Sequence, residues 1–270
     1  MTRLAGNQAR VIPSSARWSD ANSHESLCYH PRVVSQDGCK VVRGHFKQAD
    51  LEWLRLAGES SVDDVVSDDR RLKSGASTWR YLPLEHEGRP NPVLTKEFLE
   101  LVREFAGPNA SLRRRPFYKV SACGVYKDIA QEWHRDRDLG QTTVIVPLTN
   151  VTKDSPHTEV LPKTLSIRRG RDPRQDWLAR LFLPIEKALH EPLRLFGAPG
   201  DVSLLKTNLL AHRVVIPKTG VEREAVFLSF SFSRSLNPRK SEFFNASEVR
   251  SALKKYPSLD ERIYDITTEV

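Results

Sequence analysis

The second half of the chain carries the pattern that most constrains its fold. From about Ser111 onward, short segments show the apolar alternation of half-buried strands, and polar or glycine-containing turns separate them. In order, these segments read RPFYKVSACGVY, TTVIVPLTNV, GDVSLLK, AHRVVI and EAVFLSFSFS. Short strands joined in this way predict a mostly antiparallel β core, and a jelly-roll barrel (double-stranded β-helix) accommodates them.

Helical segments flank this core. Four stretches have helical spacing or helix end signals: residues 47–60, 89–107, 172–190 and a last one that begins near Asn245. We expect the first to stop at Gly58, the second to be capped by Asn91 with Pro92 in its first turn, and the third to bend at Pro184. The apolar stripe of the second helix is predicted to be Leu94, Phe98, Leu101 and Phe105. The expected class is α+β, mainly β: a jelly-roll core with flanking N-terminal helices and a helical insertion.

The composition is that of an ordinary soluble globular protein. The chain has 270 residues, of which 39% are hydrophobic and 28% are charged. We expect a single domain over residues 31–270, preceded by a loosely ordered leader over residues 1–30. The longest apolar runs, such as AVFLSF, are far too short to span a bilayer, so no membrane partner is expected.

Cysteine use and net charge bear on location and partners. Cys28, Cys39 and Cys123 cannot all pair with one another, and none lies in a C-x-x-C arrangement. This indicates a reduced, intracellular protein, and we expect a cytoplasmic location with organellar import as the alternative. The net charge of +8 suits acidic partners, and a basic solvated surface is the simpler explanation.

The stretch QEWHRDRDLG suggests a metal site. In an extended strand, His134 and Asp136 would share one face, with Arg135 and Arg137 on the other. An imidazole beside a carboxylate is two thirds of a common metal site, so a third ligand is needed. His212, in NLLAHRVVIP, lies within the late strand block, although an isolated histidine at a strand edge is more often structural.

The strand after His212 adds a second signal. Alternation in REAVFLSFSFS places Val226, Leu228, Phe230 and Phe232 on an apolar face, opposite Arg223, Ala225, Phe227, Ser229 and Ser231. The second face suits a barrel interior that holds a small ligand. An inward Arg223 is costly to bury without an anion, which a dicarboxylate would supply through a bidentate pair. Alternatively, Arg223 lies at the exposed start of the strand and pairs with Glu222 or water.

Together these residues resemble a known family. The order His-x-Asp, a distant His and an Arg eleven residues later (223 − 212) is similar to that of the Fe(II)/2-oxoglutarate-dependent dioxygenases, and in particular to the phytanoyl-CoA dioxygenase-like (PhyH) branch. Three further stretches resemble that branch: DGCKVVRGHFKQADL, TTVIVPLTNVTKDSPHTEVLPKTLS and GDVSLLKTNLLAHRV. The resemblance covers roughly residues 35–234. Two departures are LPKTLS, which lacks the usual Gly-Ser-His, and Cys39, which replaces an aromatic residue.

The resemblance implies an assignment for each site residue. His134, Asp136 and His212 would bind Fe(II) as a facial triad, and Arg223 would hold the far carboxylate of 2-oxoglutarate. Ile145 and Lys119 fall where the branch contacts this cosubstrate. Related halogenases lack the carboxylate of Asp136, so its presence implies hydroxylation of a small molecule, or another oxidation such as desaturation, with release of succinate and CO2.

Two other functions remain open at this stage. A zinc-dependent hydrolase on a jelly-roll fold could use the same three ligands, with Asp138 as general base, but hydrolysis gives no reason for an inward Arg223. A nucleic-acid-directed dioxygenase is prompted by the net charge and by RRRP at residues 113–116. No zinc-finger or helix-turn-helix signature supports it, so nucleic acid is an unlikely partner.

The arginines beside the proposed ligands bear on the substrate. If Arg135, Arg137 or Arg213 reaches the mouth of the site, the sequence favours an anionic small molecule. The alternative is that they point outward and pair with Asp138 or Glu132.

Overall fold

The computed structural model describes eight ranges of the chain: residues 33–36, 38–61, 77–124, 129–136, 141–161, 184–185, 187–231 and 243–268. All of them belong to the structural unit Pro31–Val270, and the statements below concern these residues. The expected leader and most of the expected helix over residues 172–190 lie outside the described ranges.

Two antiparallel sheets form the body of the unit. The strand order of the larger sheet is β1 (Val33–Gln36), β2 (Cys39–Val42), β11 (Val202–Leu205), β8 (Thr142–Pro147), β13 (Arg223–Ser231), β7 (Phe117–Ser121) and β3 (Ser77–Tyr81), with β6 (Ser111–Leu112) also paired to β13. The order of the smaller sheet is β10 (Leu193–Leu195), β9 (His157–Val160) and β12 (His212–Val215). The expected antiparallel, sheet-rich class is therefore confirmed, and the two-sheet arrangement agrees with a jelly roll.

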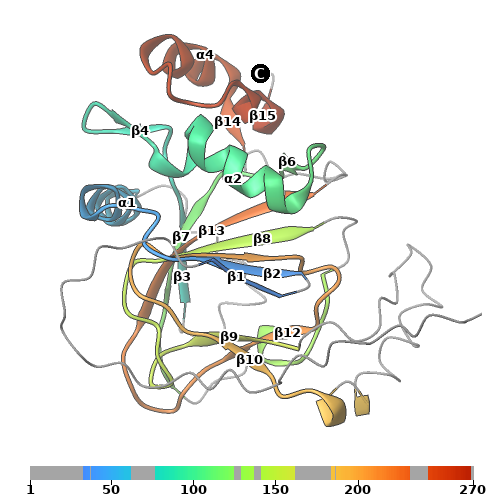
Figure 1. Cartoon of the computed structure of the whole chain (residues 1–270). Helices are drawn as coiled ribbons and strands as arrows, with labels where there is room; N and C mark the ends of the chain where they lie inside the picture. Colours follow the sequence, from blue (N-terminus) through green and yellow to red (C-terminus); the bar gives the residue numbers. More distant parts are fainter. Residues whose placement is uncertain are drawn as a thin grey trace, which may run out of the picture. The chain divides into compact units, whose positions relative to one another are not determined.

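The two faces of the larger sheet have different coverings. In Figure 1 the helices α1 (Gln48–Ser60), α2 (Lys96–Ala106) and α4 (Ala246–Lys255) lie on one side of it, and the smaller sheet lies on the other. Val226, Leu228 and Phe230 of β13 are buried in the main hydrophobic core, together with apolar residues of α1 and α2. A second cluster joins residues of both sheets and includes Ile145 of β8 and Val160 of β9.

Short elements complete the described part of the fold. They are the hairpin β4 (Glu85–His86) and β5 (Arg89–Pro90), the parallel pair β14 (Phe244–Asn245) and β15 (Thr267–Thr268), and the 3₁₀ turns η2 (Pro92–Leu94), η3 (Ile129–Gln131) and η5 (Glu261–Ile266). No helix in the described ranges is both long enough and apolar enough to cross a bilayer.

Gly58 does not end the first helix as the sequence suggested. The helix continues to Ser60, and a Cβ atom at Gly58 would lie 2.4 Å from Cγ of Tyr118 on β7. The glycine therefore serves the close approach of α1 to the sheet, a requirement of tertiary packing that the local sequence does not reveal.

The second predicted helix is divided in two. Asn91 caps η2 by accepting a hydrogen bond from the backbone N–H of Val93, and Thr95 then caps α2. The predicted end at Gly107 is confirmed by its φ of 113°. The buried face of α2 is Phe98, Leu99, Val102 and Ala106, whereas Leu101 and Phe105 are only partly buried. His157 is the first residue of strand β9.

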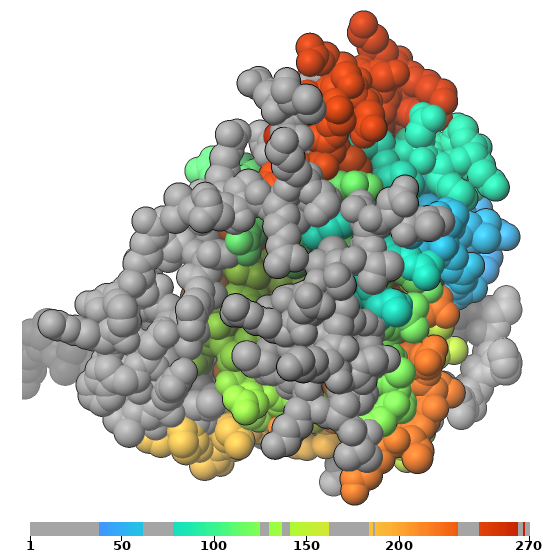
Figure 2. Space-filling model, turned by 180° about the vertical axis from the view of Figure 1, so that it is seen from behind, coloured from blue at the N-terminus to red at the C-terminus, as the bar shows by residue number. Residues whose placement is uncertain are grey.

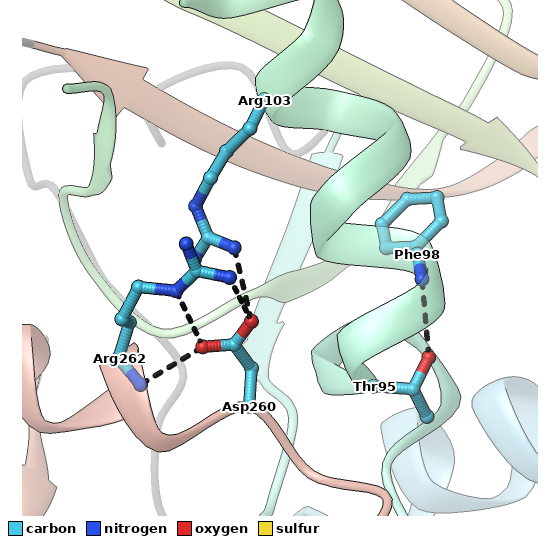
Figure 3. A network of polar contacts seen from close by, with 5 residues as sticks. All are labelled: Thr95, Phe98, Arg103, Asp260 and Arg262. Atoms are coloured by element: carbon cyan, nitrogen blue, oxygen red, sulfur yellow. Dashed lines mark hydrogen bonds and ion pairs between the residues drawn. The ribbon is translucent and has the colours of Figure 1, made fainter. Parts of the chain in front are cut away.

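The C-terminal segment is attached to α2 by a buried carboxylate (Figure 3). Asp260 accepts hydrogen bonds from Nη1 of Arg103 at 3.0 Å and from Nε and Nη2 of Arg262 at 2.9 and 2.8 Å. Burial alone would raise the pKa of Asp260, but the hydrogen bonds from Arg262 and Arg103 outweigh it and hold the pKa well below its usual range. From behind, Figure 2 shows the C-terminal residues (red) bordering the teal region that contains β4 and α2.

The Asp260 network predicts a loss of stability on mutation. Asp260→Asn should lower the free energy of unfolding at pH 7 by about 2–3 kcal/mol, because Arg103 loses its buried anion. The folded-state pKa lies below the unfolded value of about 3.9, so the stabilisation is present above that value and is lost as the pH falls below it. Urea denaturation should therefore show the two proteins converging in acid.

Glu85→Gln is the matched control for this measurement. It breaks the exposed pair between Glu85 and Lys255, in which both side chains are more than 40% exposed, and it should change stability little. Equal losses from the two substitutions would contradict the role given to Asp260.

Candidate metal centre

The structure brings His134, Asp136 and His212 together. Each offers a ligand atom, and these atoms lie within 4.8 Å of one another. The centroids of the two imidazole rings are 4.3 Å apart, and all three residues are half-buried. Among the described residues, these three side chains are close enough together to hold a metal ion.

Backbone hydrogen bonds set the positions of the three side chains. His134 and His212 form an antiparallel bridge, with N···O distances of 3.0 and 2.9 Å, so their side chains project to the same side. The backbone N–H of Asp136 donates to the carbonyl of Thr207 at 2.9 Å, which holds the residue beside the turn that leads into β12.

Both imidazole rings expose the same nitrogen to the centre. Nδ1 of His134 lies 2.8 Å from the carbonyl oxygen of Glu132, and Nδ1 of His212 lies 3.1 Å from that of Leu210. A carbonyl can only accept, so Nδ1 carries the proton and Nε2 keeps a lone pair for a metal. Burial lowers the pKa of His212, which favours the neutral imidazole that coordination requires.

The predicted cosubstrate residues share one face of the larger sheet. Arg223 of β13 is 2% exposed and lies opposite Ser121 of β7, while Lys119 lies opposite Ala225. Ile145 of β8 lies opposite Phe227 and belongs to the cluster between the sheets. His212 lies opposite Val160 of that same cluster, so the metal ligands and Arg223 both border the space between the sheets.

Ser121 is a polar residue of this face that the sequence analysis missed. It is 3% exposed, and its hydroxyl has no hydrogen-bond partner among the described residues. The hydroxyl lies on the strand directly opposite the buried guanidinium of Arg223. A carboxylate placed there would accept from both groups. Residues two apart in a strand point to the same face, so the assignment of Lys119 to the interior already implied that Ser121 also points there.

A row of stacked aromatic rings supports the inward cations. The rings of Phe117 and Phe227 stack with centroids 5.4 Å apart, and those of Phe117 and Trp79 stack at 4.9 Å. The ammonium of Lys119 lies 4.7 Å from the Trp79 centroid, and the guanidinium of Arg223 lies 5.5 Å from that of Phe227. Cation–π contacts of this kind reduce the cost of burying both charges.

The described arginines beside the ligands have partners elsewhere. Arg213 makes an ion pair with Glu159 at 2.7 Å and lies over the ring of Trp133. Nε of Arg135 donates to the carbonyl of Leu209 at 2.9 Å. The partner of Arg213 is thus Glu159, which lies opposite it on β9, so the structure gives no reason to assign Arg213 to an anionic substrate. Arg137 and Asp138 lie outside the described residues.

Comparisons with known proteins gave matches among solved structures alone. No protein-family model matches the chain, and no curated protein matches it. EctD from S. alaskensis, in a structure with 2-oxoglutarate and 5-hydroxyectoine, is 18% identical over 75% of this chain and 77% of its own, with a TM-score of 0.49.

Two further structures give similar values. AviO1 from Streptomyces viridochromogenes Tue57 is 16% identical over 76% of this chain and 93% of its own, with a TM-score of 0.47. HygX from Streptomyces hygroscopicus, in a structure with nickel, 2-oxoglutarate and hygromycin B bound, is 15% identical over 78% of this chain and 87% of its own, with a TM-score of 0.46. Because these TM-scores lie below 0.5, the functional argument rests on the residues of this chain.

Proposed function

We propose that this protein is an Fe(II)- and 2-oxoglutarate-dependent oxygenase that hydroxylates a small molecule and releases succinate and CO2. The proposal rests mainly on one observation, which is that the candidate metal ligands and Arg223 lie in the same region of the fold. A possible three-ligand metal site and a buried arginine border the same space between two antiparallel sheets. Residues 31–270 would form this single jelly-roll catalytic domain.

The donor set fits Fe(II). Two imidazole nitrogens and one carboxylate oxygen bind this ion while leaving coordination positions open. His134, Asp136 and His212 would hold it, with both rings fixed by their Nδ1 hydrogen bonds. When bound, the metal and its cosubstrate supply the oxidising power needed to attack an unactivated carbon, while the chain orients the reactants and excludes water.

The face that carries Arg223 fits 2-oxoglutarate. The planar guanidinium can grip one carboxylate through two parallel hydrogen bonds, and the hydroxyl of Ser121 can add a third. Ile145 offers an apolar surface for the carbon chain, and Lys119 adds a second positive charge to the same face. A zinc hydrolase has no use for this anion-binding arrangement, which favours the oxygenase.

The metal site predicts three equivalent loss-of-binding variants. His134→Ala, Asp136→Ala and His212→Ala should each abolish Fe(II)-dependent turnover and lower the affinity for Mn(II), measured by calorimetric titration, while circular dichroism shows an intact fold. Each substitution removes one of only three protein ligands. Unchanged affinity in all three variants would show that the metal does not bind there.

His157→Ala is the matched control for these variants. Nδ1 of His157 also bonds to a backbone carbonyl two residues earlier, that of Ser155, at 2.9 Å. His157 is buried against the ring of Phe196 and is not part of the three-residue group. Its substitution should therefore reduce stability without reducing Mn(II) affinity.

A second experiment tests the cosubstrate site. With an inert divalent metal and 2-oxoglutarate at a hundredfold excess over its dissociation constant, the wild-type protein should gain about 2.7 kcal/mol of stability. Arg223→Ala should lose most of this gain in an anaerobic thermal-shift titration. Arg223→Lys should recover only part of it, because an ammonium keeps the charge but lacks the planar fork.

Val226→Ala serves as the control on the same strand. Val226 is buried on the opposite face of β13, so its truncation should lower stability but preserve the shift caused by 2-oxoglutarate. Equal shifts in wild type and Arg223→Ala would exclude Arg223 as the anchor and favour the zinc hydrolase.

A further inference from the structure

Gln141 connects the carboxylate of Asp136 to a positive charge behind it. Its Nε2 donates to Oδ2 of Asp136 at 2.7 Å, and its Oε1 accepts from Nη1 of Arg113 at 3.3 Å. A carboxylate can only accept and a guanidinium can only donate, so both contacts are satisfied in a single orientation of the amide. The side chain is thus oriented by both of its neighbours.

The backbone also fixes Gln141 next to the ligand. The carbonyl of Gln141 accepts from Oγ1 of Thr207 and from the N–H of Asn208, each at 3.4 Å. The carbonyl of Thr207 in turn accepts from the N–H of Asp136. Gln141 directly precedes β8, and the backbone N–H of Arg113 donates to Ser229 of β13 at 2.8 Å. Two central strands of the larger sheet therefore anchor the network.

This contact distinguishes the two oxygens of Asp136. Oδ2 already accepts a short hydrogen bond, whereas Oδ1 makes no such bond to Gln141 and can face a metal. A carboxylate that is free to rotate can bind a metal through both oxygens and so occupy one more coordination position. The guanidinium of Arg113 polarises the amide and strengthens its donation to Oδ2.

We propose that Gln141 is a positioning residue that commits Asp136 to the metal through Oδ1 alone. The protein then supplies three ligand atoms and not four, which preserves positions for a chelating cosubstrate and for oxygen. This inference rests on the proposed metal site and deepens it, because it names the residue that keeps the site open. Partners of ligating carboxylates typically change metal affinity 10- to 100-fold when removed, on the order expected here.

The test is a Co(II) titration of the metal-free full-length protein. Visible absorption reports the coordination number of Co(II), and competition with a chelating dye gives the affinity. Gln141→Leu keeps the size of the side chain but removes both hydrogen bonds. It should weaken Co(II) binding about 10- to 100-fold and change the absorption spectrum. Gln141→Asn keeps the amide on a shorter arm and should recover part of the affinity.

Thr143→Val is the matched control for a nearby polar contact. Thr143 lies two residues along the chain from Gln141, and its hydroxyl lies 3.3 Å from that of Thr207 rather than on the carboxylate of Asp136. Its loss should leave both the affinity and the spectrum of Co(II) unchanged. Circular dichroism of the metal-free proteins establishes whether each variant folds. If Gln141→Leu does not fold, the Co(II) affinity and spectrum of Gln141→Asn, compared with wild type, decide whether Gln141 positions Asp136.

The outcomes separate this inference from the function on which it rests. If Gln141→Leu matches wild type in affinity and spectrum while His134→Ala no longer binds Co(II), the metal site stands and the role of Gln141 is wrong. If His134→Ala also binds Co(II) as wild type does, the metal centre itself is wrong. Weak binding with an altered spectrum in Gln141→Leu, and neither change in Thr143→Val, supports the positioning role.

Discussion

The antiparallel bridge between His134 and His212 is the contact on which the candidate metal centre depends. Its two backbone hydrogen bonds join segments that lie 78 residues apart in sequence (212 − 134) and point both rings to the same side. The bond from Nδ1 to a carbonyl then fixes each ring, and Gln141 fixes the carboxylate of Asp136. The main chain therefore sets the spacing of the three side chains, and their remaining rotations are restrained before any metal arrives.

Strand β13 carries both the core and the site. Val226, Leu228 and Phe230 are buried beneath the helices, and the alternate residues, which include Arg223 and Phe227, face the smaller sheet. Because a one-residue slip would exchange the two faces, the apolar core that holds the strand in register also holds the guanidinium in place. Burying this charge is unfavourable by itself, and the cation–π contact with the ring of Phe227 offsets part of the cost.

Local patterns in the sequence predicted the local features of the structure. The alternation of β13, the late strands and the helix caps at Asn91 and Asn245 follow from periods of two and from short-range hydrogen bonds. Packing across long sequence separations was not predictable in this way. It placed Gly58 inside a helix against Tyr118, and it paired Arg213 with Glu159. The sequence identified the three candidate ligands, but their partner Gln141 emerged only from the structure.

Some of the residues that carry the family resemblance shape the larger sheet, and others form the candidate site. Asp201 is buried where β2 and β11 meet, and it accepts hydrogen bonds from the backbone N–H groups of Gly44 and Ala198, both at 2.9 Å, and pairs with Arg43. The pairs Arg43–Gly44 and Gly200–Asp201, which belong to two of the stretches that carry the resemblance, therefore build a corner of the larger sheet. This corner fixes β11 beside β8, and Gln141, which holds Asp136, directly precedes β8. Such residues support the fold, whereas the chemistry that we propose would depend on the ligand set, on Gln141 behind it and on the inward Arg223.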